Sequence, residues 1–407
     1  MKCRHCGSAL SNKFLDLGFS PPSNAYLSGD DLDRVEKYYP LKLYICESCW
    51  LLQTADFASA GELFDSQYAY FSSTSSAWLR HAEEFVTDMV SRLRLDSRSF
   101  VVEIASNDGY LLKNFVSLGI PCLGIEPTAS TAKAAESIGI PVLSEFFGKA
   151  LAEQLIQKRP LADLIIGNNV FAHVPDINDF SQGLKLLLSP AGTISLEFPH
   201  LLQLLRFAQF DTVYHEHFSY LSLHAVQAIL AKAGLRTYEV EELSTHGGSL
   251  RVFACHEEAD KPVHPSVQRI LAHEINAGMT TAAGYLGFQQ RAEALKNAAL
   301  SFLIDVRNSG KRICGYGAAA KGSTMLNFAG VKPDLLPYVC DAAAAKQNKF
   351  LPGSHIPILH PNEIRQSQPD FIVILPWNLR EEVADSLSFA RSWGAKFVTF
   401  IPELKVF

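Results

Sequence analysis

The sequence lacks any apolar run long enough to span a bilayer, and residues 1–6 lack the apolar core of a secretion signal. It also lacks runs of basic residues, and its 36 Lys and Arg residues are outnumbered by 42 Asp and Glu residues, which gives a formal net charge of −6. Such a chain has no general attraction for nucleic acid or for an anionic membrane surface. We therefore expect a soluble, cytoplasmic protein with neither a membrane nor a nucleic acid as partner.

Cysteine is scarce along most of the chain, but four of the eight cysteines form two Cys-x-x-Cys pairs near the N-terminus. Within each pair, the two-residue gap lets both thiolates reach one tetrahedral zinc ion. Residues 7–45 separate the pairs, which is more than in a usual zinc ribbon and predicts an inserted loop. We expect Cys3, Cys6, Cys46 and Cys49 to bind a structural zinc, because four protein ligands leave no open position for a substrate. Four unrelated thiols are the alternative.

Short strand-like runs alternate with helical patterns over residues 97–255 and again after residue 311. A chain of 407 residues is too long for one ordinary core, and its 48% hydrophobic and 19% charged residues are typical of a globular protein. The alternation predicts an α/β fold with two Rossmann-like domains, joined by a helical segment over residues 265–306 and preceded by a small loop-rich module. We place the domains at residues 1–65, 66–290 and 291–407.

The first α/β unit carries a turn suited to a nucleoside-bearing cofactor. A strand over residues 100–104 leads through small and polar residues into a helix, so that a cofactor can approach the backbone. The next strand ends at a carboxylate, Glu126, which is the usual position for binding ribose hydroxyls. The turn lacks the full Gly-x-Gly-x-x-Gly series, which disfavours a dinucleotide and favours S-adenosylmethionine (SAM). A domain with no ligand at this turn is the alternative. The expected cofactor-binding residues are Glu103, Ala105, Ser106, Asn107, Asp108, Gly109, Glu126, Pro127, Asn168, Asn169 and Val170.

The densest set of proton-transfer groups lies at Tyr214, His215, Glu216 and His217. An imidazole can accept a proton near neutral pH, a phenol can hydrogen-bond a developing oxyanion, and a carboxylate can orient either group. His173, in the loop after the predicted strand at 163–166, could face the reacting group. Two other interpretations remain open, a zinc- or iron-binding His-x-His strand and a solvated polar loop.

A second turn, over residues 314–324, matches Gly-x-Gly-x-x-Ala after a strand and before a helix, and Asp341 ends the next strand. Backbone N–H groups, Lys321 and the helix N-terminus would favour a phosphate or pyrophosphate there. This pattern leaves an alternative function open, a NAD(P)-dependent nucleotide-sugar oxidoreductase that uses Gly315, Gly317 and Asp341. A non-enzymatic zinc-ribbon adaptor is a third.

In this order, the motifs resemble those of the nucleotide-sugar C-methyltransferases that act on dTDP-linked deoxy-keto-sugars. The resemblance covers essentially the whole chain and includes residues 68–73, 246–251 and 375–378 besides the motifs above. It implies a zinc-binding N-terminal domain, a Rossmann-like SAM domain and a C-terminal Rossmann-like domain that helps to hold the sugar nucleotide. Departures from the family pattern, at Ser323 and over residues 341–348, leave the identity of the nucleotide and the sugar open.

The resemblance also implies site residues. His217 is expected to remove the proton α to the ketone, and the groups that position the sugar and stabilise the enolate are expected to be Tyr214, Glu216, His173 and Tyr68. The expected substrate-binding residues are Lys321, Ser323, Asn327, Asp341, Lys346, His355, Trp377 and Asn378. The predicted function is SAM-dependent C-methylation of a nucleotide-linked 4-keto-deoxysugar, with dTDP as the expected nucleotide and without a catalytic metal. We expect a monomer or a weak homodimer.

Overall fold

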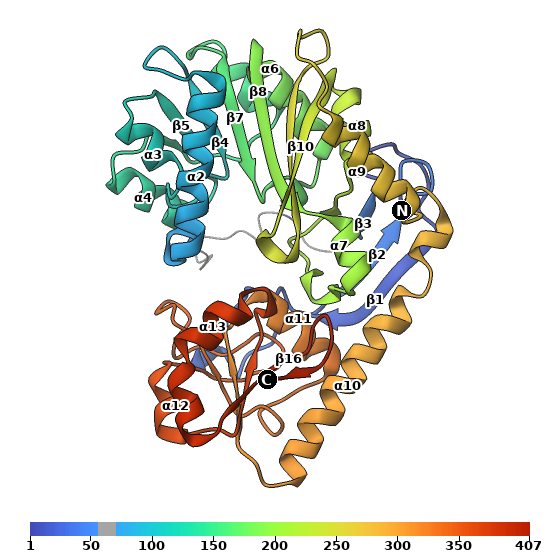
Figure 1. Cartoon of the computed structure of the whole chain (residues 1–407), viewed down its shortest axis with the longest axis vertical. Helices are drawn as coiled ribbons and strands as arrows, with labels where there is room; N and C mark the ends of the chain where they lie inside the picture. Colours follow the sequence, from blue (N-terminus) through green and yellow to red (C-terminus); the bar gives the residue numbers. More distant parts are fainter. Residues whose placement is uncertain (56–70) are drawn as a thin grey trace.

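The computed structural model describes residues 1–55 and 71–407, which form three β-sheets with helices packed around them (Figure 1). The predicted α/β class is confirmed, because the two larger sheets are built mainly from parallel strands. No helix among these residues combines the length and the apolar character that a bilayer crossing requires.

The smallest sheet belongs to the N-terminal module, and its strands lie in the order β1-β2-β3-β9. Each neighbouring pair is antiparallel. The bounds are β1 Asn12–Ser20, β2 Tyr39–Ile45, β3 Leu52–Thr54 and β9 Ser219–Tyr220, with a short 3-10 helix η1 at Gly29–Asp31. The fourth strand comes from the middle of the chain, so the segment directly after His217 is fastened to the edge of the N-terminal sheet.

The central sheet has seven strands in the order β10-β11-β8-β7-β4-β5-β6, in which β11 is antiparallel to both of its neighbours. Its strands are β4 Val101–Ile104, β5 Cys122–Ile125, β6 Val142–Leu143, β7 Ala162–Asn168, β8 Leu188–Pro199, β10 Leu235–Leu243 and β11 Ser249–His256. The helices of this region are α2 Ser76–Leu93, α3 Leu112–Ser117, α4 Ala129–Ser137, α5 Lys149–Leu155, α6 Ile177–Leu187, α7 Leu201–Phe207 and α8 Leu223–Lys232. Short 3-10 helices are η2 Ser72–Thr74, η3 Phe171–His173, η4 Phe210–Thr212 and η5 Thr245–Gly247.

β4 lies between β7 and β5 in this sheet and is buried along its whole length. Burial on both faces explains the nearly continuous apolar runs by which the strands were predicted. The parallel strands β4, β5 and β7 end at the same edge of the sheet. That edge brings together residues 105–109, Glu126 and residues 168–170.

The connecting segment differs from the single helical stretch expected over residues 265–306. It forms α9 Pro265–Asn276, η6 Ala282–Tyr285 and α10 Phe288–Asn308. Gly278 and Gly287 adopt φ angles of 78° and 76°, which interrupt a helix. A Cβ at Gly284 would lie 2.3 Å from the carbonyl oxygen of Gly278, so the chain doubles back on itself here.

The C-terminal sheet has the order β14-β13-β12-β15-β16-β17, and its strands are parallel apart from β17. The strands are β12 Ile313–Tyr316, β13 Val339–Cys340, β14 Ile358–Leu359, β15 Phe371–Ile374, β16 Lys396–Thr399 and β17 Lys405–Val406. The helices are α11 Ala320–Ala329, α12 Asn362–Ser367 and α13 Arg380–Ser386, with 3-10 helices η7 Trp377–Leu379 and η8 Ser388–Trp393. The Gly-x-Gly turn lies between β12 and α11, as predicted.

β1 and α10 lie side by side along one flank of the molecule and connect its upper and lower parts (Figure 1). The side-chain Oε1 of Gln289 accepts a hydrogen bond from the backbone N–H of Asp16 at 2.8 Å. One apolar core includes Leu15, Leu204, Phe288 and Leu326, and thus runs from the N-terminal sheet into the C-terminal domain. The three parts of the chain are therefore packed into one body.

Candidate active site

The turn after β4 adopts a backbone that few residues tolerate. Ala105, Asn107 and Gly109 have φ angles of 56°, 51° and 79°, in the left-handed region. At Gly109 a Cβ atom would lie 2.2 Å from the Cδ1 of Ile140, so both the backbone and the available space require glycine. Backbone strain of this kind, at the end of a central strand, is typical of a ligand-binding turn.

Glu126 is fixed beside this turn at the end of β5. Its Oε2 accepts a hydrogen bond from the backbone N–H of Asn107 at 2.9 Å, and its Oε1 accepts one from the backbone N–H of Thr128 at 2.8 Å. A Cβ at Gly124 would lie 2.4 Å from the Oγ of Ser106, so the two strand ends approach closely only because residue 124 is glycine. The carboxylate thus occupies the position expected of a ribose-binding group.

Buried polar atoms without a partner gather around the same turn. Among the described residues, no hydrogen bond reaches Glu103 Oε2, Ser106 Oγ, Asp108 Oδ1, Asn168 Oδ1 or Asn169 Oδ1. Unpaired buried acceptors are costly, so this set indicates a ligand rich in donors. Burial, and then the charges of Glu126 and Asp108, raise the pKa of Glu103 well above its ordinary value. SAM fits this site, because it carries an ammonium group, ribose hydroxyls, an adenine amine and a positive sulfonium.

His217 lies in a cluster of aromatic and imidazole rings. Its ring centroid is 4.0 Å from that of Tyr214 and 4.6 Å from that of His173. Burial, and then the neighbouring His173, lower the pKa of His217 well below its ordinary value, while a hydrogen bond to the backbone of Thr212 opposes the shift. The imidazole is therefore neutral at physiological pH and can accept a proton.

His173 is held by the segment that carries His217. Its Nδ1 lies 2.8 Å from the backbone carbonyl oxygen of Glu216, and a carbonyl can only accept, so Nδ1 carries the proton. Burial lowers the pKa of His173 to about 4, which keeps this ring neutral as well. The side-chain carboxylate of Glu216 accepts hydrogen bonds from the Nδ2 of Asn24. Sequence reasoning did not identify Asn24.

The loop after β7 connects predicted cofactor-binding residues to the ring cluster. β7 ends at Asn168, and the chain continues through Asn169 and Val170 into η3, which ends at His173. Asn169 has a φ of 54°, and its backbone N–H donates to the carbonyl oxygen of Glu197 at 2.7 Å. The loop therefore begins with predicted cofactor-binding residues and ends with a predicted catalytic residue.

Three of the residues predicted to bind substrate come together at the boundary with the central domain. The Nε1–H of Trp377 donates to the Oδ2 of Asp211 at 2.7 Å, and the Nζ of Lys321 donates to the Oδ1 of Asn378 at 2.7 Å. The Lys321 ammonium lies 4.6 Å from the Trp377 ring centroid. Burial lowers the pKa of Lys321 to about 8, although the charge of Asp211 opposes the shift. The positive charge of Lys321 also contributes to the lowered pKa of His217.

The Gly-x-Gly turn of the C-terminal domain is filled by protein groups. The Oδ2 of Asp341 accepts from the backbone N–H of Ala318 at 2.7 Å. The carbonyl oxygen of Ala318 accepts from the Tyr26 hydroxyl at 2.6 Å and from the Lys346 ammonium at 2.9 Å. A Cβ at Gly317 would lie 2.5 Å from the Cδ of Pro376. Asp341 and Lys346 therefore stabilise the turn itself, which gives no support to a nicotinamide site there.

The remaining predicted substrate residues have other surroundings. Asn327 Nδ2 donates to the carbonyl oxygen of Pro352 at 3.1 Å, and His355 Nε2 lies 2.8 Å from the Oε2 of Glu36. His355 therefore contacts the N-terminal module, whereas Asn327 makes its hydrogen bond within the C-terminal domain. Ser323 is fully buried, and its hydroxyl has no hydrogen-bond partner among residues 1–55 and 71–407. Tyr68 lies outside the described residues.

Two similar knuckles present the four N-terminal cysteines to one point. In the first, the backbone N–H of Gly7 donates to the carbonyl oxygen of Cys3 at 3.0 Å. In the second, the backbone N–H of Trp50 donates to the carbonyl oxygen of Cys46 at 2.7 Å. Gly7 and Trp50 have φ angles of 78° and 58°, so the two turns share one unusual backbone. The second knuckle connects β2 to β3.

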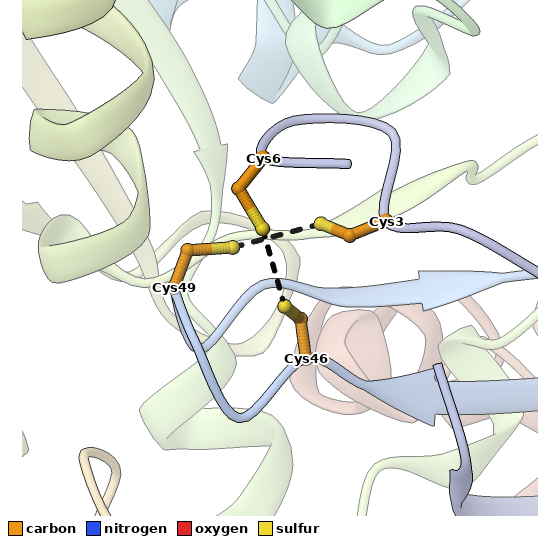
Figure 2. Close-up of side chains that lie close together, drawn as sticks. All are labelled: Cys3, Cys6, Cys46 and Cys49. Carbon is orange, nitrogen blue, oxygen red and sulfur yellow. Dashed lines mark hydrogen bonds between the residues drawn. The ribbon is translucent and has the colours of Figure 1, made fainter. Parts of the chain in front are cut away.

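The sulfur atoms of Cys3, Cys6, Cys46 and Cys49 point toward one another (Figure 2). Two of the Sγ–Sγ distances are 3.6 Å and 3.5 Å, and all four atoms lie within 4.8 Å of one another. A tetrahedron with Zn–S bonds of about 2.3 Å has edges of about 3.8 Å, so the cluster fits one zinc ion. Four thiolate ligands close the coordination sphere, in accord with a structural role.

The C-methyltransferase NovU of Streptomyces niveus is 33% identical over 405 residues, a match that covers 100% of this chain and 96% of the relative. The chain belongs to the C-methyltransferase family. Three family descriptions match consecutive segments, "Putative zinc binding domain" over residues 3–64, "Methyltransferase domain" over residues 78–240 and "C-methyltransferase C-terminal domain" over residues 244–402.

Two solved structures match part of this chain with low sequence identity. The PH0226 protein of Pyrococcus horikoshii OT3 is 13% identical, covers 49% of this chain and 99% of its own, and has a TM-score of 0.38. The magnesium protoporphyrin IX methyltransferase of Synechocystis PCC 6803, with bound S-adenosylhomocysteine, is 16% identical, covers 44% and 83%, and has a TM-score of 0.36.

Family membership selects among the interpretations of the sequence. The chain is a SAM-dependent C-methyltransferase with a zinc-binding N-terminal domain, so the expected enzyme class and both expected cofactors are confirmed. The oxidoreductase and adaptor alternatives lose their support. The cradle around Glu103 and Glu126 would hold SAM, which supplies an electrophilic methyl group.

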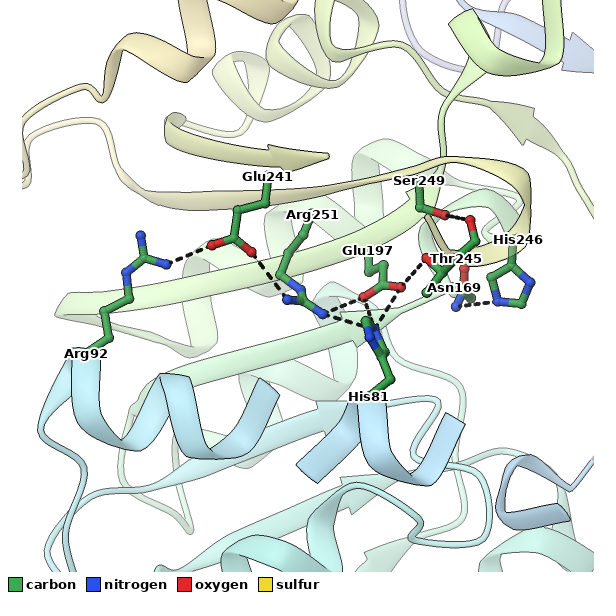
Figure 3. A network of polar contacts seen from close by, with 9 residues as sticks. All are labelled: His81, Arg92, Asn169, Glu197, Glu241, Thr245, His246, Ser249 and Arg251. Atoms are coloured by element: carbon green, nitrogen blue, oxygen red, sulfur yellow. Dashed lines mark hydrogen bonds and ion pairs between the residues drawn. The ribbon is translucent and has the colours of Figure 1, made fainter. Parts of the chain in front are cut away.

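A buried ionic network supports the site of this C-methyltransferase, and sequence reasoning missed it (Figure 3). Glu197, at the end of β8, accepts from Arg251 at 2.8 Å and from Thr245 at 3.0 Å, and lies 2.9 Å from the Nε2 of His81 on α2. Beside Thr245, His246 places its Nε2 3.4 Å from the Nδ2 of Asn169. The signal in the sequence was a charged residue in each of two apolar strands, at positions 197 and 251.

Proposed function

We propose that the enzyme methylates a carbon atom next to the ketone of a nucleotide-linked 4-keto-deoxysugar, with dTDP as the nucleotide. The observation that carries the proposal is the neutral, buried His217 in contact with Tyr214 and His173. A carbon acid beside a ketone is weakly acidic, so a base must be combined with donors aimed at the oxygen where charge develops. The cluster provides both kinds of group.

In the proposed reaction, His217 takes the proton from the carbon α to the ketone, and the electron pair of the broken C–H bond moves into an enolate. Its lowered pKa ensures that the imidazole starts unprotonated, and the enolate charge then stabilises the imidazolium. The phenol of Tyr214 is the candidate to stabilise the enolate oxygen. The neutral His173 donates its Nδ1 proton to the backbone of Glu216, so its Nε2 can only accept, and we assign it a role in orienting a sugar hydroxyl. Bound SAM would supply an electrophilic methyl group to the enolate carbon, with S-adenosylhomocysteine as the leaving group.

The residues of the C-terminal domain support a phosphorylated substrate. Lys321, whose charge contributes to the lowered pKa of His217, presents a cation next to Trp377 and Asn378. A lysine is a common phosphate ligand, and an indole offers an apolar face to a sugar or base. We propose that this group holds the nucleotide while the loop at 168–173 presents the sugar to the methyl donor. Orientation by two domains then contributes much of the rate enhancement.

The experiment is incubation with SAM labelled with ¹³C in its methyl group and a panel of dTDP-4-keto-deoxysugars. NMR of the product should show the labelled methyl on carbon, and His217→Ala should lower the rate by about 10²- to 10⁴-fold with SAM affinity kept. His273→Ala, an exposed histidine on α9, is the matched control and should leave the rate unchanged. Label on oxygen, or no product with any sugar, would refute the proposal.

A further inference from the structure

Asn24, in the N-terminal module, reaches the ring cluster of the central domain. Its side-chain Nδ2 donates hydrogen bonds to both carboxylate oxygens of Glu216, at 3.0 Å and 2.9 Å. Glu216 is 1% exposed and Asn24 is partly buried, so the carboxylate itself is shielded from water. A hydrogen bond to an ionised acceptor is about twice as strong as one between neutral groups, and contact with both oxygens restricts rotation of the carboxylate.

The loop that carries Asn24 is anchored on the C-terminal domain at both sides of this residue. The Ser23 hydroxyl lies 3.3 Å from that of Thr324, on α11. The Tyr26 hydroxyl donates to the carbonyl oxygen of Ala318, in the Gly-x-Gly turn, at 2.6 Å. Asn24 thus stands where all three parts of the chain meet, and its position depends on the C-terminal domain as much as on its own module.

The backbone of this loop is restricted before it reaches Asn24. Pro21 and Pro22 fix two φ angles, and the backbone N–H of Ala25 donates to the carbonyl oxygen of Pro22 at 3.1 Å to close a turn. Prolines reduce the number of conformations that must be given up when a loop becomes ordered. The loop can therefore present one amide side chain in a defined place.

We propose that Asn24 is a positioning residue, which holds the Glu216 carboxylate in the orientation that methyl transfer requires. This inference rests on the proposed function, in which Glu216 belongs to the reacting cluster. It also gives the N-terminal module a part in the active site. A zinc ion bound by the four cysteines would fix the module, the module carries the loop, and the loop supplies a side chain to the ring cluster.

The first experiment compares wild type and Asn24→Ala with SAM and a dTDP-4-keto-deoxysugar that wild type methylates. We expect kcat to fall by about 10- to 100-fold, because a small misplacement of a site group has effects of this size, with the Kd of SAM unchanged within about twofold. The matched control is Asn12→Ala. Asn12 donates to Glu47 at the surface of the same module, so this change removes the same kind of bond far from the cluster and should leave kcat unchanged.

Two further variants separate positioning from a general loss of structure. In a Glu216→Gln background, Asn24→Ala should have little further effect on kcat, because residues that act through one another are not additive. Asn24→Asp places a second carboxylate against Glu216, and repulsion disfavours ionisation of the pair. The acid limb of the kcat/KM profile should therefore move to higher pH, whereas a partly unfolded enzyme would lose activity equally at every pH.

The outcomes distinguish this inference from the proposed function. If wild type methylates none of the keto-sugars, the proposed function fails and the role of Asn24 fails with it. If wild type is active but Glu216→Gln is equally active, Asn24 has no site group to position. If Glu216→Gln is impaired while Asn24→Ala matches wild type, or if the two losses multiply in the double variant, the inference alone is overturned.

Discussion

The indole Nε1–H of Trp377 donates to the Oδ2 of Asp211 at 2.7 Å, across the boundary between the C-terminal and central domains. Asp211 is 1% exposed, and burial raises its pKa to about 6, although the charge of Lys321 and the indole hydrogen bond oppose the shift. A carboxyl whose pKa is higher in the folded state favours folding when protonated. Its contribution is present below pH 4 and is lost as the pH rises through about 6.

Asp211→Asn should remove this pH dependence while keeping an oxygen acceptor for Trp377. The difference in the free energy of unfolding, variant minus wild type, should increase by about 2 to 3 kcal/mol from pH 4 to pH 7. Urea denaturation at a series of pH values measures the difference. Asp334→Asn, at an exposed pair with Arg307, is the control. Its free energy of unfolding should depend on pH in the same way as that of wild type. Parallel curves for Asp211→Asn would contradict the assignment.

Removal of zinc should affect both stability and the reacting segment. Because β9 follows His217 and pairs with β3, and β3 follows the second knuckle, the metal supports the strand next to the base. Cys46→Ser should reduce the zinc content below one ion per chain and lower the Tm by roughly 10 °C or more. Elemental analysis and calorimetry provide the measurements. Cys122→Ser, a buried cysteine in β5, should keep one zinc per chain. An unchanged metal content in Cys46→Ser would exclude Cys46 as a ligand.

Binding of SAM should release a proton from Glu103. The raised pKa means that this carboxyl holds its proton to a higher pH in the free enzyme, and a bound cation favours the ionised form. The affinity for SAM should therefore increase with pH until the Glu103 carboxyl of the SAM-free enzyme is itself ionised. Glu103→Gln should abolish the proton release and weaken binding by about 10- to 100-fold. Calorimetry in buffers of different ionisation enthalpy measures the release, and Glu136→Gln, exposed on α4, is the control. A binding heat independent of buffer for wild type would argue against this coupling.

Features set by short-range patterns could be predicted from the sequence. The strands β4, β5 and β7 appear as apolar runs because both faces are buried, and the turn at 105–109 is recognisable by its small residues. The same holds for the zinc knuckles, in which two residues between cysteines determine the local geometry. The break of the connecting helix at Gly278 was missed, although glycine was its visible signal.

Features that depend on partners far apart in the chain could not be predicted. Nothing in the local sequence of Asn24 indicates that it contacts Glu216, and nothing near Trp377 indicates Asp211. The pairing of β9 with β3 could not be predicted from the sequence either, because a strand of two residues is too short for an apolar pattern that would fix its register. Lys346 was expected from the family resemblance to bind substrate, and nothing in its local sequence indicates the contact of its ammonium group with the carbonyl oxygen of Ala318.

Opposing effects of burial and of charged partners determine the pKa of the Glu197 carboxylate. Burial alone would raise its pKa, but the hydrogen bond with His81 and the charge of Arg251 outweigh burial and lower it. The stabilisation is therefore present above the unfolded-state pKa and is lost as the pH falls through the folded-state value. At neutral pH the Glu197–Arg251 pair should be fully effective, and removal of Arg251 takes the guanidinium cation from a buried carboxylate that keeps its contacts with His81 and Thr245.

Arg251→Met should accordingly lower the free energy of unfolding by about 3 to 5 kcal/mol, as measured by urea denaturation at pH 7. The double variant Arg251→Met with Glu197→Gln should be more stable than Arg251→Met alone, because the buried charge that lost its guanidinium partner is gone. Arg307→Met, at the exposed pair with Asp334, should cost at most about 1 kcal/mol. If the double variant were less stable than the single one, the cost would come from lost packing of Arg251 against Phe85 rather than from its charge.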